Sequence, residues 1–144
     1  MIELSRYFFL AGGLPFILLG LAHARATPFH VDDRKGLSPS DPSLAAAMAK
    51  AHPLLTRRTD IWRAWVSFNL THSLGAVLFG AFVLLIGRNA STFEQNALFA
   101  LPLSLVTAAI YLVLGINYWF KIPIAGCLIA TACFAVSVVL RLFT

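Results

Sequence analysis

Residues 64–87 read AWVSFNLTHSLGAVLFGAFVLLIG, an unbroken run of twenty-four residues without a formal charge between Arg63 and Arg88. A helix needs about twenty mainly apolar residues to cross a hydrocarbon core about 30 Å thick. The run lacks the alternation of apolar and polar residues that a membrane β-strand shows. Within lipid, a single segment satisfies all of its backbone groups only as a helix. The run therefore predicts a membrane-spanning helix.

Three further uncharged runs have a similar length. They cover residues 7–24, 95–120 and 122–140 and contain 18, 26 and 19 residues. Each run is near or above the length that a spanning helix needs. We therefore predict an all-α, polytopic membrane protein with a single transmembrane domain over residues 1–144, built as a four-transmembrane-helix bundle. The predicted helices cover residues 7–25, 62–87, 95–116 and 122–142.

The composition agrees with this class. The 144 residues are 59% hydrophobic and only 12% charged, with a mean hydropathy of +0.81. Soluble globular domains carry roughly 25% charged residues, so the composition excludes that class and predicts a lipid bilayer as the surroundings. The formal net charge is +5, but no motif of a nucleic-acid-binding protein accompanies it. Nucleic acid is therefore not an expected partner.

The only sizeable segment outside the predicted spans covers residues 27–61. Within it, Asp41 is suited to cap a helix and Pro42 to occupy the first helical position. We predict a short helix from Pro42 to about His52. Its apolar residues follow helical spacing and form one side, which we expect to pack on the bundle or to lie against the membrane surface. These residues are Leu44, Ala47, Met48 and Ala51.

The orientation follows from the Lys and Arg residues near the helix ends, because positively charged short loops tend to stay in the cytoplasm. Eight of them lie on the side of the first and third connections, namely Arg25, Arg34, Lys35, Lys50, Arg57, Arg58, Arg63 and Lys121. Three lie on the other side, namely Arg6, Arg88 and Arg141. We therefore predict periplasmic termini and a cytoplasmic loop over residues 27–61. Interface aromatics are expected on the more positive side, at Trp62, Trp65, Tyr118 and Trp119.

The first predicted helix has a second interpretation. Arg6, the apolar run after it and the small residues around Arg25 resemble the three regions of a cleaved signal peptide. Gly20 and His23 interrupt that apolar run, and Glu3 offsets Arg6. We therefore favour an anchored helix.

Polar residues gather on one face of the second predicted helix. Asn69, His72 and Ser73 stand at positions i, i+3 and i+4 and so share a face. The first predicted helix offers a matching face with a second intramembrane histidine, made of Gly13, Phe16, Gly20, His23 and Ala24. From the residue positions, the depths of His23 and His72 differ by about 6 Å, a gap that helix tilt would close.

Three interpretations of this cluster remain open. In the first, the histidines and Asn69 form a polar pocket that binds the head of a ligand or passes a proton. In the second, His23 and His72 hold haem or a metal ion. In the third, the cluster only joins helices by hydrogen bonds. No nucleophile with a base and an orienting group can be assembled from the sequence, so it identifies no catalytic residue.

A second polar group lies where the second helix enters the membrane. Arg63 stands three residues after Asp60 and close to Arg57 and Arg58. Such a group typically anchors a protein to anionic head groups. The alternative is a basic mouth to the histidine pocket, suited to a ligand with an acidic head.

The chain resembles a family of small bacterial membrane proteins with four predicted helices and no assigned activity. The resemblance is carried by Gly20-x-x-His23, by Trp62-Arg63-Ala64-Trp65 and by Phe68-Asn69-x-Thr71-His72-Ser73-Leu74-Gly75, within about the first 80 residues. It implies the fold and a location in the bacterial inner membrane. We expect a binding or accessory protein without a cofactor, which takes a lipophilic small molecule or joins a larger membrane complex. The alternative is a membrane enzyme or electron carrier that uses His23 and His72 to hold haem or a metal.

Overall fold

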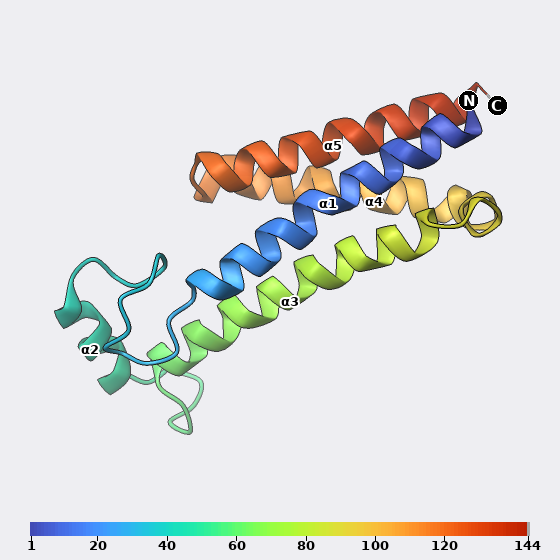
Figure 1. The fold of residues 1–144 in the computed structure, drawn as a ribbon. Coiled ribbons are helices and arrows are strands. Elements are labelled where there is room, and N and C mark those ends of the chain that lie inside the picture. The colour runs from blue at the N-terminus through green and yellow to red at the C-terminus, as the bar shows by residue number, and fades with distance from the viewer. Residues whose placement is uncertain (144) are drawn as a thin grey trace. The chain divides into compact units, whose positions relative to one another are not determined.

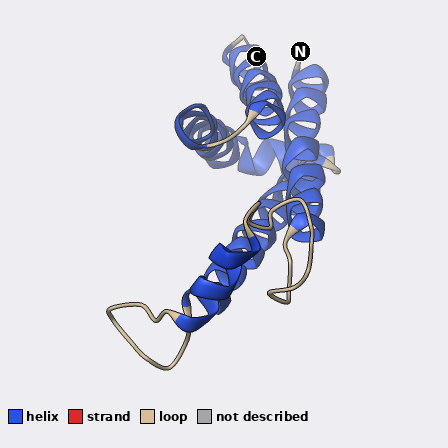
Figure 2. Cartoon of the chain, turned by 90° about the vertical axis from the view of Figure 1, so that its left-hand side faces the viewer, coloured by secondary structure: helices blue, strands red, loops and turns tan. Residues whose placement is uncertain are grey.

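The computed structural model describes residues 1–143 and is all-helical over that range, without strands (Figures 1 and 2). Four of its helices are long and apolar enough to cross a membrane. The predicted fold class, a four-helix membrane protein with one short helix in the first loop, is thus confirmed. The helices are α1 (Ile2–Ala26), α2 (Pro42–Lys50), α3 (Ile61–Gly87), α4 (Ala90–Tyr118) and α5 (Lys121–Leu142).

Two of the long helices begin five residues before their predicted starts. In α1, Arg6 forms an ion pair with Glu3 on the same helix, and its Nη1 donates to the carbonyl oxygen of Gly87 at 2.9 Å. A charge with such partners does not end a helix. In α4, the Asn89 side chain caps the first turn by accepting the Ser91 backbone N–H at 3.0 Å.

The described residues form two compact units, to which α1 and α3 each contribute a part. The first, here called the four-helix unit, contains residues 1–19 and 76–143. It holds the first part of α1, the last part of α3, and α4 packed against α5. The second, the loop unit, contains residues 20–75, with the end of α1, the loop with α2, and the start of α3.

Aromatic rings form the core of the four-helix unit. Phe9, Phe93 and Phe134, from three different helices, are each 0% exposed. The centroid of the Phe9 ring lies 5.4 Å from that of Phe93 and 5.8 Å from that of Phe134. At one end of this unit the Ser5 hydroxyl donates to the Ser137 carbonyl at 2.8 Å, and the Ser137 hydroxyl donates to the Ser5 carbonyl at 2.8 Å. The start of α1 and the end of α5 therefore lie side by side.

In the loop unit, α2 begins as predicted. The Asp41 side chain accepts the Ser43 backbone N–H at 2.8 Å, and Pro42 is the first helical residue. The helix ends at Lys50 rather than near His52, because the next carbonyl, that of Ala51, accepts the Ile61 N–H at 2.9 Å and fastens the chain to the start of α3.

The predicted apolar side of α2 is mostly exposed. Leu44 is 52% exposed and Ala47 and Ala51 are also exposed, whereas Met48 is partly buried. The buried residue of α2 is Ala45, which is 3% exposed. The spacing of apolar residues identified one side of α2. The side that is buried in the protein is a different one, in a helix whose end is attached to the start of α3 by the Ala51–Ile61 hydrogen bond.

Candidate functional site

A hydrogen-bonded pair in the loop unit joins α1 to α3. The Nε2 atom of His23 lies 2.8 Å from the Oδ1 atom of Asn69, and the Nδ2 atom of Asn69 donates to the Trp65 carbonyl at 2.8 Å. Asn69 is only 7% exposed. The predicted match between the polar faces of these two helices is therefore realised as a direct contact.

The position of Asn69 selects the tautomer of His23. Because the amide nitrogen donates to the Trp65 carbonyl, the amide oxygen faces His23 and must accept a hydrogen. In a neutral His23, Nε2 therefore carries the hydrogen and Nδ1 keeps its lone pair. Among residues 1–143, none donates a hydrogen bond to that Nδ1 atom. The lone pair can accept a hydrogen from a ligand or take up a proton.

His72 completes the cluster. The centroid of its ring lies 5.1 Å from that of His23, with the two planes at 64°, so the predicted difference in depth does not separate the rings. The His72 ring also stacks on Phe68, at 6.4 Å between centroids and 14° between planes. Phe68 is 69% exposed, on a helix long and apolar enough to cross a membrane. His23 and His72 are themselves partly exposed.

Ser73 shares the helix face but takes no part in the imidazole pair. Its hydroxyl donates to the carbonyl of Asn69, one turn earlier, at 2.8 Å, and the residue is 2% exposed. Serine in a membrane helix commonly satisfies its hydroxyl in this way. Among the expected site residues, Ser73 therefore uses its hydroxyl within its own helix.

The arrangement is a poor fit for haem or a metal site. A porphyrin held by two histidines must lie between their rings, but the rings of His23 and His72 are in edge-to-face contact. Within the described part of the chain, no three His, Cys, Asp or Glu side chains are grouped so that they could hold a metal ion. The contact that the pair itself shows is a hydrogen bond, between His23 and Asn69.

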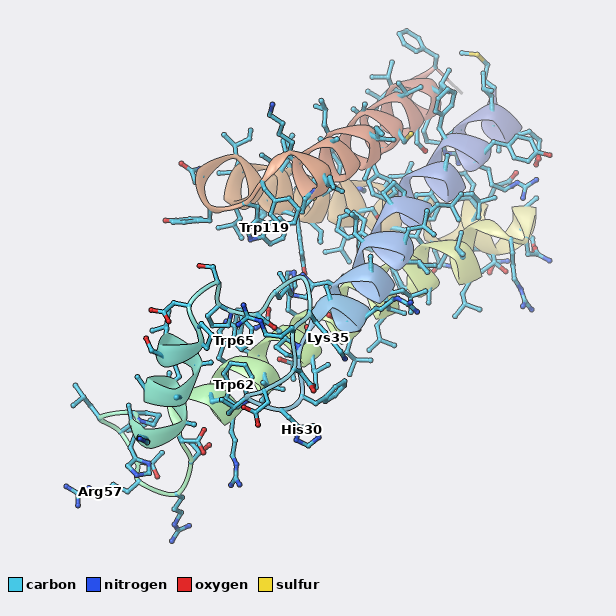
Figure 3. The ribbon with its side chains drawn as sticks, turned by 60° about the vertical axis from the view of Figure 1, so that its left-hand side comes forward. His30, Lys35, Arg57, Trp62, Trp65 and Trp119 are labelled. Atoms are coloured by element: carbon cyan, nitrogen blue, oxygen red, sulfur yellow. The ribbon has the colours of Figure 1, made fainter. Side chains whose placement is uncertain are left out.

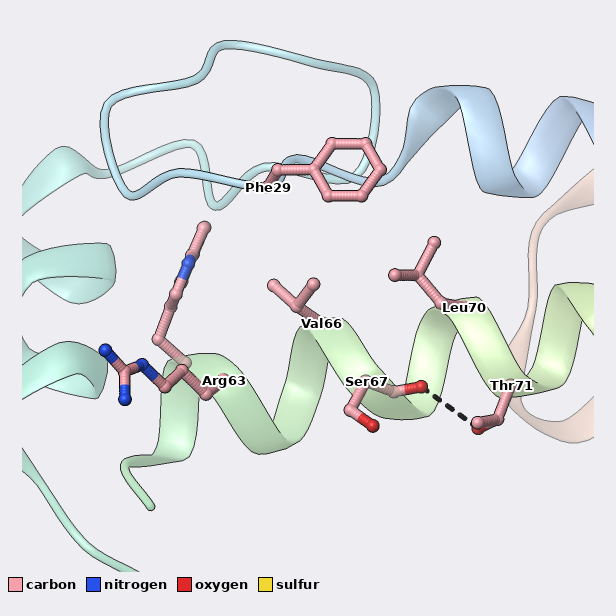
Figure 4. A pocket seen from close by; sticks show the side chains of 7 residues that line it. Phe29, Arg63, Val66, Ser67, Leu70 and Thr71 are labelled. Atoms are coloured by element: carbon pink, nitrogen blue, oxygen red, sulfur yellow. Dashed lines mark hydrogen bonds between the residues drawn. The ribbon is translucent and has the colours of Figure 1, made fainter.

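Arg63 lies in a different place from the histidines. Its Nε is 3.4 Å from the Asp60 carboxylate, which confirms the predicted proximity, and its side chain is 78% exposed. It lines a separate groove of about 290 Å³ within the loop unit (Figure 4). The other lining residues are Phe29, Trp62, Val66, Ser67, Leu70 and Thr71.

Phe29 and the burial of Trp62 are the features that sequence reasoning missed. Trp62 was expected at the lipid interface but is only 4% exposed, and its ring lies 5.3 Å from that of Trp65 (Figure 3). The chain after α1 places Phe29 in the groove that Trp62 also lines. No periodic signal marks Phe29, because it belongs to a loop.

A turn holds Phe29 in place. The Oδ2 atom of Asp33 accepts the backbone N–H groups of Phe29 and His30 at 2.9 and 3.0 Å. The hydrogen bonds from His30 and Phe29 lower the pKa of the exposed Asp33 carboxyl below its usual 3.8, so it is ionised at neutral pH. The Lys35 ammonium lies 4.8 Å from the centre of the Phe29 ring. Phe29, His30 and Asp33 therefore form a structural turn.

The imidazole pair with Asn69 and the groove beside Arg63 are the two places in the loop unit with chemistry suited to a ligand. Comparison with protein-family models, curated proteins and solved structures gives no match.

Proposed function

We propose that the protein is a binding or accessory protein of the bacterial inner membrane, whose His23–Asn69–His72 site holds the polar head of a lipophilic small molecule. The observation that carries the proposal is the pair of imidazoles in contact, with Asn69 fixing the tautomer of His23. Intramembrane histidines and their partners commonly mark functional sites.

The chemistry favours a ligand with a hydroxyl or another hydrogen-bond donor. The Nδ1 lone pair of His23 accepts such a donor in the neutral state, because Nε2–H is already given to Asn69. The exposed Phe68 next to His72 offers an apolar surface to the rest of the ligand. A molecule dissolved in the bilayer reaches this site sideways, without crossing water.

The test compares His72→Gln with His72→Ala and with Thr71→Val. We expect the parent protein, purified in lipid nanodiscs, to retain a lipophilic compound that mass spectrometry detects in an organic extract. Both His72 variants should lose it, whereas Thr71→Val should keep it, because the Thr71 hydroxyl is exposed and bonds only to its own helix. His72→Gln should also fail to complement any phenotype of a deletion strain.

The stability of the His72 variants distinguishes a binding site from a cluster that only joins helices by hydrogen bonds. Intramembrane hydrogen bonds are worth about 0.6 kcal/mol on average, so His72→Gln should remain folded and monodisperse. Full complementation by His72→Gln, or equal loss of compound from Thr71→Val, would contradict the proposal. A Soret band or a stoichiometric metal in the parent would favour the haem or metal alternative instead.

The proposed orientation places both termini in the periplasm and residues 27–61 in the cytoplasm, as the distribution of Lys and Arg predicts. A phosphatase fused to the C-terminus should be active, and a fluorescent protein fused there should be dark, because each folds on only one side of the membrane. Bright fluorescence with an inactive phosphatase would reverse the orientation.

A further inference from the structure

The groove of the loop unit has a gradient of polarity along α3. Arg63 lies at the end of the groove near the start of the helix, and Leu70 lies seven residues further on, about 10 Å along the axis at 1.5 Å per residue. Figure 4 shows the Phe29 ring facing Val66 and Leu70 across the groove, with Arg63 beyond them. The charged lining residue of the groove, Arg63, thus lies toward the start of α3. Phe29, Val66 and Leu70 form an apolar strip further along the helix, beside Ser67 and Thr71.

The Arg63 guanidinium is free to take an anion. Its one charged partner is Asp60, at 3.4 Å from Nε, and its side chain is 78% exposed. In the described part of the chain, no acceptor is hydrogen-bonded to its two terminal nitrogens. A guanidinium with two such nitrogens binds a phosphate with two parallel hydrogen bonds.

The charge of the loop unit favours an anionic partner. Residues 20–75 contain seven Lys and Arg (Arg25, Arg34, Lys35, Lys50, Arg57, Arg58 and Arg63) against four Asp (Asp32, Asp33, Asp41 and Asp60). One of these cations, Lys35, lies over the Phe29 ring.

Phe29, which forms one wall of the groove, belongs to a turn with charged residues. The Asp33 carboxylate accepts the backbone N–H of Phe29 and so fixes its position.

From this geometry we propose that the groove binds one anionic phospholipid, with its phosphate on Arg63 and an acyl chain along Val66 and Leu70 beneath the Phe29 ring. The order of groups in the groove matches that of a lipid in a leaflet, with its head at the surface and its chain toward the interior. A soluble phosphate compound would leave the apolar part of the groove unfilled. The site is separate from the His23–Asn69–His72 cluster and does not depend on the function proposed for it.

The experiment measures lipid retention by native mass spectrometry after reconstitution of the full chain with equal amounts of phosphatidylglycerol and phosphatidylcholine. We expect the parent protein to retain phosphatidylglycerol preferentially. Arg63→Gln should reduce that preference by roughly tenfold or more, because it removes the charge that strengthens both hydrogen bonds to the phosphate. Because the Arg63 side chain is exposed, the variant should fold normally, which its thermal unfolding checks.

Two other variants distinguish a specific lipid-binding site from a general attraction by the positive surface charge. Arg57→Gln removes the same charge from a residue that extends away into the loop (Figure 3), and it should keep the preference. Phe29→Ala removes the apolar wall and should reduce retention of both lipids. Equal effects of Arg57→Gln and Arg63→Gln would show that only overall charge attracts the lipid. No preference in the parent would show that the groove holds only bulk bilayer lipid, and either result would overturn the proposal.

Discussion

Gly80→Leu is expected to destabilise the protein by about 1–3 kcal/mol, the usual cost of overpacking, and toward the upper end of that range. A Cβ atom added at Gly80 would lie 2.7 Å from the Gly13 carbonyl oxygen and 2.5 Å from the Cγ1 atom of Ile17. The Gly13 oxygen belongs to the backbone of α1, so a side-chain rotation cannot relieve this contact. The helix α1 itself therefore has to move. Small residues at such crossings let two membrane helices approach closely, and Gly80 and Gly13 meet at such a crossing.

Gly75→Leu is the matched control for this change. It lies on the same helix and gains the same side chain, but a Cβ atom added there meets nothing within 4 Å. Thermal unfolding in detergent, followed by circular dichroism, should show a lower midpoint for Gly80→Leu and an unchanged or higher midpoint for Gly75→Leu. Equal midpoints for Gly80→Leu and the parent would show that α1 and α3 do not cross tightly at Gly80.

Phe134→Ala is expected to cost about 3–5 kcal/mol, as measured for buried phenylalanines. The Phe134 ring is 0% exposed and lies 5.8 Å from the Phe9 ring and 6.2 Å from the Phe79 ring, measured between centroids. It sits over Gly12, where an added Cβ atom would come within 2.6 Å of it. Its loss would therefore leave a cavity among three helices that the surrounding backbone cannot fill.

Phe99→Ala provides the comparison for Phe134→Ala. Phe99 is 76% exposed on α4, so its removal leaves no cavity in the protein. We expect denaturant unfolding in mixed micelles to give Phe134→Ala a much lower free energy of unfolding than the parent. The value for Phe99→Ala should be close to that of the parent. Similar stabilities for the two variants would mean that the aromatic core contributes little and that the helices are held together by other contacts.

The candidate site was only partly predictable. Helical spacing placed Asn69 and His72 on one face and matched it with His23, and these three side chains do meet. The same spacing placed Ser73 with them, but its hydroxyl bonds to its own helix. Spacing assigns a face, whereas the choice between a neighbouring helix and the carbonyl one turn earlier depends on short-range geometry.

The sequence by itself determined the helical class, the four spans and the cap of α2 at Asp41. These features depend on residues close together in the chain: a long apolar run, or a capping side chain beside free backbone N–H groups. Tertiary structure alone decided that Phe29 covers the start of α3, that Trp62 is buried, and that α2 turns Ala45 inward. The physical reason is that a loop has no periodicity, so its path depends on contacts between segments that are separated in the chain. Examples are Phe29 and Trp62, which line one groove, and the Ile61 N–H, which donates to the Ala51 carbonyl.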